Sequence, residues 1–244
     1  MTNWHKGHLL AFDTETTGVD VENDRIVTAC ASLINGTTGE ANTKTWLANP
    51  GIDIPEGATN VHGITTEYAA EHGDDPRAVV QTLTDTLMGQ VYKGVPIVGC
   101  NLQYDLTLLD RETRRHGLEP LADRFARALP FVIDVRVLDK YVDRYRKGGR
   151  KLVDLCVTYD ARIDGAHDAS HDAIAAARVA YRIAARHPKI AAMQLHELHA
   201  LQVKACAEQQ RSFRAYREKK GDPVVAPEEW PIIPFAVEPA EAVR

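Results

Sequence analysis

Two acidic residues stand two positions apart in a segment whose composition is typical of a buried strand. The segment is HLLAFDTET, and because side chains alternate along a strand, it places Asp13 and Glu15 on one face. The apolar run before them favours a central strand, where two adjacent carboxylates repel each other unless a divalent cation lies between them. The alternative is that the strand has reached its exposed end and that water solvates both acids.

A third acid lies in the apolar stripe of an expected helix, NLQYDLTLLDRE. Leu102, Asp105, Leu108 and Leu109 follow one another at spacings of three and four residues, so Asp105 faces the same way as the leucines. A carboxylate in such a stripe needs a partner. The helix dipole, with Asn101 as the N-cap, explains why an acid is tolerated in the first turn. It does not explain why the acid faces inward.

The segment HDASHDAIAAARVAYRIA supplies a fourth acid and a histidine. An alanine-rich stripe predicts a helix over about 168–186, with Asp172 at the edge of the buried face and Asp168 further outside, as a first-turn acid. His167 precedes the helix, where a side chain is free to turn toward a site. The alternative is that His167 is a polar cap and His171 a surface residue.

Four carboxylates and one histidine suit phosphodiester hydrolysis with two metal ions. Two divalent cations ~4 Å apart orient and activate a water molecule and stabilise the leaving oxygen. A histidine, with a pKa near 6.5, is matched to accept the proton of that water, whereas carboxylates that bind cations are poor bases.

The elements that must position these residues are strands followed by a mixture of helices and strands. This order predicts a mixed β-sheet flanked by helices rather than a regular alternation of strand and helix. The expected strands are 8–16, 26–33, 43–47, 95–100 and 131–134, the first two antiparallel. The expected helices are 76–89, 101–116, 152–159 and 168–186. Loops are expected at 49–63 and, rich in basic residues and glycine, at 144–151.

The pattern changes after Pro188. Residues 189–219 predict a long, increasingly charged helix, and the proline-rich end of the chain excludes a regular helix. We therefore expect one domain over 6–187 and an accessory C-terminal extension over 188–244, a long helix followed by a proline-rich tail.

Composition limits the class of protein. The 244 residues include 29 basic and 34 acidic side chains, a net charge of −5, which excludes a general polyanion-coating protein but not a nucleic-acid enzyme that uses bound cations. The N-terminal residues have no apolar stretch typical of a signal peptide, and no apolar run reaches the length of a membrane span. The four cysteines are widely spaced and mostly in apolar segments, which favours reduced core thiols. These features predict a cytoplasmic protein.

Taken in order, the motifs resemble those of the DnaQ-like 3′→5′ exonucleases of the DEDDh type, the family that contains the proofreading epsilon subunit of bacterial DNA polymerase III. The matching segments are FDTETTG at 12–18, NVHGIT at 60–65, NLQYD at 101–105 and HDASHD at 167–172, within a region of similarity over about 6–187. Each motif is weak alone, and four in order are specific. Asp at position 168 disfavours the related subclass with tyrosine there.

The resemblance implies an RNase H-like fold and a role for each motif residue. It implies that Asp13, Glu15 and Asp172 hold two divalent cations, Mg²⁺ or Mn²⁺, directly, that Asp105 holds one through water, and that His167 is the general base. It also implies contacts of the motif segments with the nucleic acid. The expected contact residues are Thr14, Thr16, His62, Asn101 and Tyr104.

The implied activity is metal-dependent removal of nucleoside monophosphates from the 3′ end of single-stranded DNA. An exoribonuclease similar to oligoribonuclease or RNase T is the alternative enzyme, because the motifs are shared and discrimination depends on contacts to the 2′-hydroxyl. A binding module that keeps the fold without catalysis is the alternative from another class, although all five catalytic positions are filled. The resemblance also makes a DNA polymerase subunit a candidate partner.

Overall fold

The structure, a computed structural model, describes residues 3–164 and 168–236 and contains a five-stranded sheet. The strands are β1 (His8–Thr16), β2 (Ile26–Asn35), β3 (Ala41–Leu47), β4 (Ile97–Gly99) and β5 (Val132–Asp134). Their order in the sheet is β3-β2-β1-β4-β5; β2 is antiparallel to both β1 and β3, and β4 and β5 are parallel to β1. The predicted mixed sheet is therefore confirmed.

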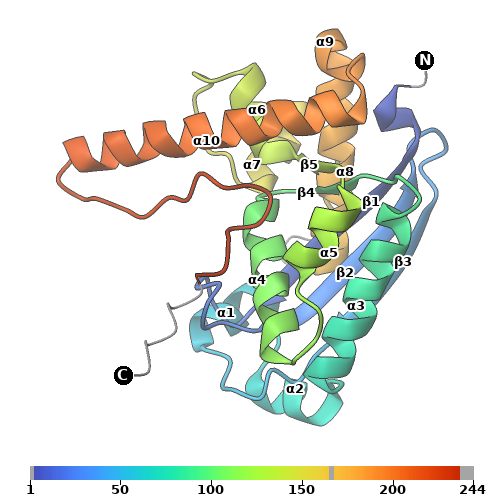
Figure 1. Ribbon diagram of the computed structural model, residues 1–244, viewed down its shortest axis with the longest axis vertical. Coiled ribbons are helices and arrows are strands. Elements are labelled where there is room, and N and C mark those ends of the chain that lie inside the picture. Colours follow the sequence, from blue (N-terminus) through green and yellow to red (C-terminus); the bar gives the residue numbers. More distant parts are fainter. Residues whose placement is uncertain (1–2, 165–167, 237–244) are drawn as a thin grey trace, which may run out of the picture.

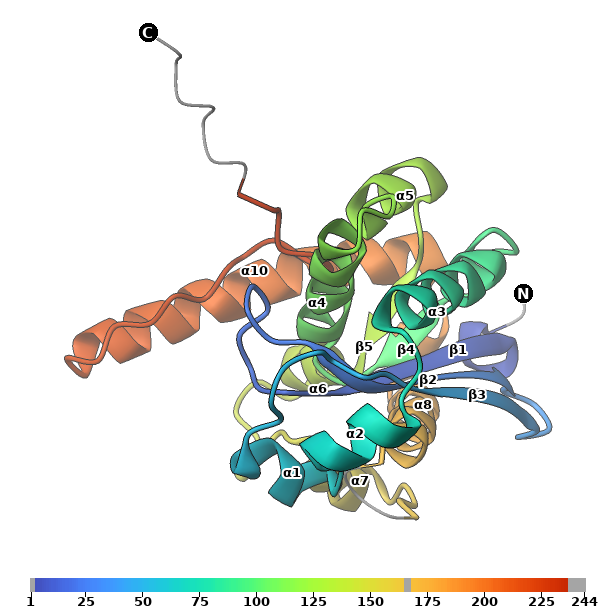
Figure 2. The ribbon, with the colours of Figure 1, turned by 90° about the horizontal axis from the view of Figure 1, so that it is seen from below.

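Helices cover both faces of this sheet (Figures 1 and 2). One face carries α3 (Pro76–Val91), α4 (Leu102–Arg115) and α5 (Leu121–Ala128). The other carries α6 (Val135–Val142), α7 (Leu152–Tyr159), α8 (Ala169–Arg186) and α9 (Pro188–Ala191). The remaining helices are the 3₁₀ turn η1 (Trp4–Lys6), α1 (Glu56–His62), α2 (Thr66–His72) and α10 (Leu195–Lys219). None of the helices in the two described ranges is long and apolar enough to cross a membrane.

The central position of β1 follows from its composition. Leu9 and Ala11 pack on the side of α8, Leu10 and Phe12 pack on the side of α4, and all four are buried. A strand buried on both faces needs such a continuous apolar run. In contrast, β3 is largely exposed and carries Lys44, as is typical of an edge strand that must not pair further.

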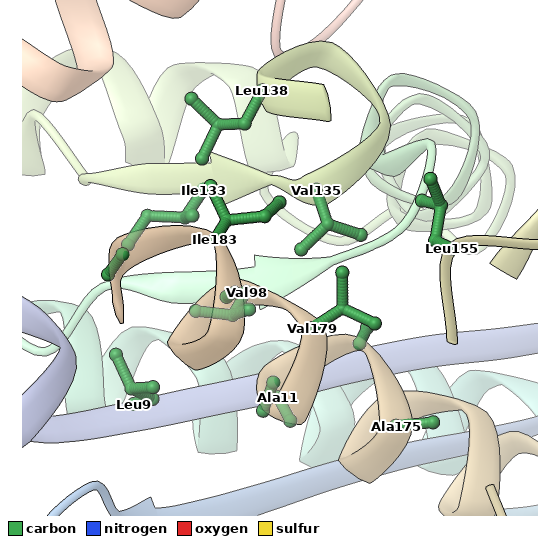
Figure 3. Close-up of a cluster of buried hydrophobic side chains, with 14 of the residues drawn as sticks. Leu9, Ala11, Val98, Ile133, Val135, Leu138, Leu155, Ala175, Val179 and Ile183 are labelled. Atoms are coloured by element: carbon green, nitrogen blue, oxygen red, sulfur yellow. The ribbon is translucent and has the colours of Figure 1, made fainter. Parts of the chain in front are cut away.

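Small side chains bring α8 close to the sheet. The predicted stripe of Ala169, Ala173, Ala176, Ala180 and Ile183 is buried. Other residues of α8 extend the same contact with β1, β4, β5 and α6, including Ala175 and Val179 (Figure 3). Alanines leave little distance between the helix backbone and β1, so the first turn of α8 reaches the end of that strand.

The segment after α10 folds back along the body. We call residues 221–236 the C-terminal strap; it runs beside α10 and returns to α4 (Figure 1). Trp230 is buried with the residues of the α4 face, its ring centroid 5.1 Å from that of His199. The backbone N–H of Ile233 donates to Thr107 Oγ1 of α4 at 3.0 Å, and Arg111 of α4 donates to the carbonyls of Ile233 and Pro234.

Several expectations about local structure were wrong. The expected loop over 49–63 contains α1, and α2, α5 and α6 were not predicted. These three helices are short, with seven or eight residues each, so their amphipathic pattern covers about two turns. The expected long helix over 189–219 is interrupted after α9, and a new capping box at Gln194 begins α10. Asp168 is the N-cap of α8 and not a first-turn acid, because its side chain accepts from the N–H groups of Ser170 and His171.

Candidate active site

Three parallel strands end at one edge of the sheet, and the chemical motifs lie there. Asp13 and Glu15 are near the carboxyl end of β1, and the segment from Asn101 to Asp105 follows β4 directly. At Gly99, a Cβ atom would lie 2.7 Å from the carbonyl oxygen of Phe12 in β1. Because only glycine permits this approach, the sequence brings the start of α4 against β1.

Asp13, Glu15 and Asp172 form an acidic cluster. One carboxylate oxygen from each residue lies within 4.8 Å of the other two, and all three side chains are partly buried. Asp13 and Glu15 point to the side of the sheet that α8 covers, and Asp172 comes from the first turn of that helix. The sequence prediction that these three residues share a site is therefore matched by their geometry.

Asp105 approaches the cluster from the other face of the sheet. Asp105 is only 4% exposed, and its Oδ1 accepts a hydrogen bond of 2.6 Å from Thr14 Oγ1. Thr14 lies between Asp13 and Glu15 but points toward α4, as strand alternation requires. The carboxylate of Asp105 is not among the three that meet within 4.8 Å, although its charge acts on Asp13.

Burial and mutual repulsion raise the pKa values of these acids. Burial raises the pKa of Glu15 to about 7, with further contributions from Asp172 and Asp105. The pKa of Asp13 lies well above its usual range, first because of burial and then because of Asp105 and Glu15. Burial also raises the pKa of Asp105 to about 7, although the hydrogen bond from Thr14 opposes it.

The donor set fits hard divalent cations. It consists of carboxylate oxygens, which Mg²⁺ and Mn²⁺ prefer. Half-burying several negative charges together costs free energy, and a bound cation would offset that cost. Among the ion pairs of the described residues, none joins a lysine or arginine to Asp13 or Glu15, so no lysine or arginine of this part of the chain neutralises these two acids.

His167, the residue expected to be the general base, lies outside the described residues. The neighbouring Asp168 is exposed and caps α8. His171 is partly buried on the first turn of the same helix.

Thr16 and Tyr104 join the end of β1 to α4. Their hydroxyl oxygens are 2.9 Å apart, and the Tyr104 hydroxyl donates to the Gly18 carbonyl at 2.5 Å. Burial raises the pKa of Tyr104 well above its usual range, so its hydroxyl keeps its proton. These contacts hold the turn that follows Glu15 against the start of α4.

His62 also belongs to this region. It is the last residue of α1, and its Nδ1 accepts from the Ile64 N–H at 3.1 Å. Burial lowers the pKa of His62, and a contact with the Thr16 backbone opposes that shift, which places the imidazole beside the end of β1.

Asn101 is the N-cap residue of α4, as expected, but its side chain makes no capping hydrogen bond. Its backbone is left-handed, with φ 69°. Asp134, at the end of β5, instead accepts from the N–H groups of Asn101 and Leu102 at 3.0 and 2.9 Å. The Asn101 side-chain oxygen accepts from Arg136 at 2.6 Å. Neither Asp134 nor Arg136 was singled out from the sequence. The sequence signal at this place is Asp134 itself, an acid at the end of a buried strand.

The fold is shared with solved exonucleases. E. coli Exonuclease I in complex with a dT13 oligonucleotide superposes with a TM-score of 0.62 and 19% identity, over 75% of this chain and 42% of that protein. Exonuclease I from Methylocaldum szegediense gives 0.61 and 22%, over 86% and 45%. The chain thus spans less than half the length of these proteins. Exonuclease X in complex with 5′-overhanging duplex DNA gives 0.55 and 18%, over 80% and 99%. The mixed sheet with its acidic cluster defines an RNase H-like α/β protein.

The sequence comparison defines the family. A family model described as exonuclease, RNase_T, matches residues 10–180, and the chain therefore belongs to this exonuclease family. The fold that the chain shares with solved exonucleases agrees with this family. No curated protein matches the chain by sequence. The nearer resemblance to the proofreading subunit of a polymerase stays a prediction.

Proposed function

We propose that this protein removes nucleoside monophosphates from the 3′ end of single-stranded DNA with the help of two divalent cations. The observation that supports this proposal most strongly is the meeting of Asp13, Glu15 and Asp172 in a chain of the exonuclease family. The raised pKa of Glu15, about 7, is the second support, because it reflects burial and then neighbouring acids, and a bound cation would offset both.

In this proposal, Asp13, Glu15 and Asp172 bind the cations directly and Asp105 binds one through water. Divalent cations at such a site supply Lewis acidity toward the phosphodiester and activate water as a nucleophile. Thr14 donates to Asp105 at 2.6 Å and so fixes the direction in which that carboxylate points. Because Thr14 and Asp105 come from β1 and α4, their hydrogen bond also fixes these two elements relative to each other.

His167 accepts the proton of the attacking water in this proposal. The support for its role is the spacing His-x4-Asp in the sequence and the match of an imidazole pKa to neutral pH. The bond from phosphorus to the new oxygen forms as the bond to the preceding nucleotide's O3′ breaks, which releases a 5′-monophosphate. Thr16, His62, Asn101 and Tyr104 contact the terminal nucleotide.

DNA is proposed as the substrate because the similar solved structures hold it. Exonuclease I was solved with dT13 and dA16 oligonucleotides, and Exonuclease X with duplex DNA that has a 5′ overhang. A polymerase subunit as partner and a cytoplasmic location remain predictions of the sequence.

The test is degradation of 5′-labelled single-stranded DNA and RNA of matched sequence, under single-turnover conditions, with Mg²⁺, with Mn²⁺ and with EDTA. We expect a ladder that shortens from the 3′ end, faster on DNA, absent in EDTA and absent in Asp13→Ala. Asp85→Ala is the matched control, because Asp85 pairs with Arg124 at the surface of α3, away from the site. If a folded protein cleaves neither substrate with either metal, the proposed activity is wrong; if it cleaves RNA faster, the choice of DNA is wrong.

A further inference from the structure

A cavity beside the candidate active site is built by the C-terminal part of the chain. Its volume is about 350 Å³, and it lies between the start of α4, the helix α6, the outer half of α10 and the strap. Figure 1 shows α10 extending beyond α6 and the strap returning beside it to α4. The lining residues that matter here are Asn101, Gln103, Arg136, Lys140, Phe213 and Pro227. We call this cavity the strap groove.

The strap groove begins at the acidic site. Asn101 lines it, and Asp105 is one helical turn further along α4, a rise of ~5.4 Å. Cys100, directly before Asn101, lies close to both the groove and the acidic cluster. Burial and then Asp134 raise the pKa of its thiol, and the charges of Arg136 in the groove and of Asp13 and Asp105 at the site also act on it. A strand whose 3′ end lies at Asp13 therefore has the strap groove next to it.

Cations of α6 line the strap groove and lack acidic partners. Arg136 and Lys140 are four residues apart, one turn of the helix, and neither forms an ion pair with an acid of the described residues. Arg136 donates to the neutral amide of Asn101. Burial lowers the pKa of Lys140, and the charges of Arg136, Arg150 and Arg144 lower it further. Positive charge is thus concentrated on this wall of the groove. Asp134 is the single acid among the described lining residues, and it is buried and accepts from the N–H groups of Asn101 and Leu102.

The cations of the outer half of α10 are arranged differently. Arg211 and Arg214 both pair with Glu228 of the strap, and Arg217 pairs with Asp222. The acids of the strap therefore neutralise these three arginines of α10, whereas the cations on the α6 side of the groove keep their charge. Phe213, 40% exposed, lines the groove from α10 and offers a ring to a base. Cations on one wall and an aromatic ring on the other are the combination that binds single strands.

We propose that the strap groove binds the phosphates of the nucleotides that precede the 3′-terminal one, so that the C-terminal extension is half of the substrate-binding surface. Arg136 and Lys140 contact phosphates, and Phe213 stacks on a base. This inference rests on the proposed exonuclease function, because it takes the direction of the strand from the acidic site. In a chain of net charge −5, a local positive groove accounts for binding a polyanion.

The first test measures binding without cleavage. Anisotropy of a 5′-fluorescein dT12 oligonucleotide in EDTA is compared for the wild-type chain, the double variant Arg136→Gln/Lys140→Gln and the control Lys93→Gln/Arg127→Gln, which removes the same charge outside the groove. We expect about tenfold weaker binding for the first variant and a slope of log Kd against log salt reduced by about 1.4, or about 0.7 for each lost contact to a single strand. Phe213→Ala weakens binding without changing the slope. Equal Kd and slope in the double variant and its control would overturn the groove.

The second test measures cleavage of two substrate lengths with Mg²⁺. A dinucleotide has no phosphate beyond the scissile one to place in the strap groove, whereas dT12 supplies a run of them. We expect the double variant to have a KM for dT12 raised about tenfold, with kcat near wild type, and a clearly smaller loss on the dinucleotide, where Arg136 acts only by holding Asn101. If the double variant and Lys140→Gln alone both lost as much activity on the dinucleotide as on dT12, the acidic site would be damaged and the groove would be refuted. Wild-type protein that binds dT12 through these cations but cleaves nothing would instead refute the exonuclease function and leave the groove standing. Melting curves verify that each variant is folded.

Discussion

The helix α4 buries Asp105 in its first turn and Asp110 near its middle, and the surroundings treat these two carboxylates in opposite ways. Asp105, in the first turn, is 4% exposed, accepts from the Thr14 hydroxyl and has a pKa raised to about 7. Asp110, further along, is fully buried and pairs with Arg111 at 2.9 Å and Arg114 at 2.8 Å. It also accepts from the Ala122 N–H.

The difference distinguishes an acid that is available to bind a cation from an acid that stabilises the fold. A buried charge is tolerated when hydrogen bonds and a counter-ion compensate for lost water. The protein supplies that compensation at Asp110. At Asp105 and the neighbouring cluster it supplies only part of it, and this leaves charge for a cation. A buried acid with no arginine beside it is thus a better sign of this site than burial alone.

The largest effect is expected from Asp13→Asn. The variant removes a direct cation ligand, and several kcal/mol of transition-state stabilisation with it, so we expect single-turnover cleavage to fall by at least about 10³-fold. The melting temperature without metal should stay equal or rise, because the substitution removes a charge that Asp105 and Glu15 repel. A marked fall in metal-free stability would contradict the comparison between the two kinds of acid.

The opposite result is expected from Asp110→Asn. Loss of this charge leaves the buried Arg111 with the half-exposed Glu22 as its acidic partner and removes the partner of Arg114, which costs about 3 kcal/mol, so the melting temperature should fall by about 10 °C. Cleavage by the protein that remains folded at 20 °C should stay within about threefold of wild type. Urea unfolding and single-turnover kinetics on the same preparation measure both quantities. Lost activity with unchanged stability would place Asp110 in the wrong group.

A smaller effect is expected from the pH dependence of stabilisation by Mg²⁺. The folded-state pKa of Glu15, about 7, is above its ordinary value of 4.5, so the folded state holds the proton more tightly. Without metal, this group therefore lowers stability as pH rises from about 4.5 to about 7, and the loss is complete above that range. A cation removes the loss. The rise in melting temperature on adding Mg²⁺ should be larger at pH 8 than at pH 5.5, by a few degrees. An equal rise at both values would contradict this linkage.

The smallest effect is expected from Thr14→Val. The substitution keeps the shape and the β-propensity of the strand and removes only the donor to Asp105 Oδ1. We expect about tenfold weaker Mg²⁺ activation with little change in maximal rate. Ser32→Ala is a matched control, because Ser32 donates to or accepts from Thr43 on the far strands. An unchanged Mg²⁺ titration would mean that Thr14 does not orient Asp105.

Much of this arrangement could be predicted because its signals are local. The alternation of β1 placed Asp13 and Glu15 on one face, and the leucine spacing of α4 turned Asp105 inward. The cap supplied by Asp134 could not be predicted, because it depends on β5 lying beside β4. The same holds for Asp110: its spacing from Arg114 is also found on exposed helix surfaces, and only the fold shows that it is buried.

The C-terminal extension was the least predictable part. Prolines exclude a helix, but they do not say which surface the chain will follow. The hydrogen bond of Ile233 to Thr107 joins residues 126 positions apart, and no periodic pattern encodes such a pair.

The strap also sets an order of events for a chain leaving the ribosome. A nascent chain that has emerged as far as α8 already contains every acid of the site, but the outer face of α4 is still open. Thr107 gains its hydrogen bond only when Ile233, 126 residues later, has been synthesised, and Arg111 likewise gains its bond to the carbonyl of Ile233 only then. Contacts of such long separation form late in folding. The helix that presents Asp105 is therefore secured by a segment that is synthesised well after every acid of the site.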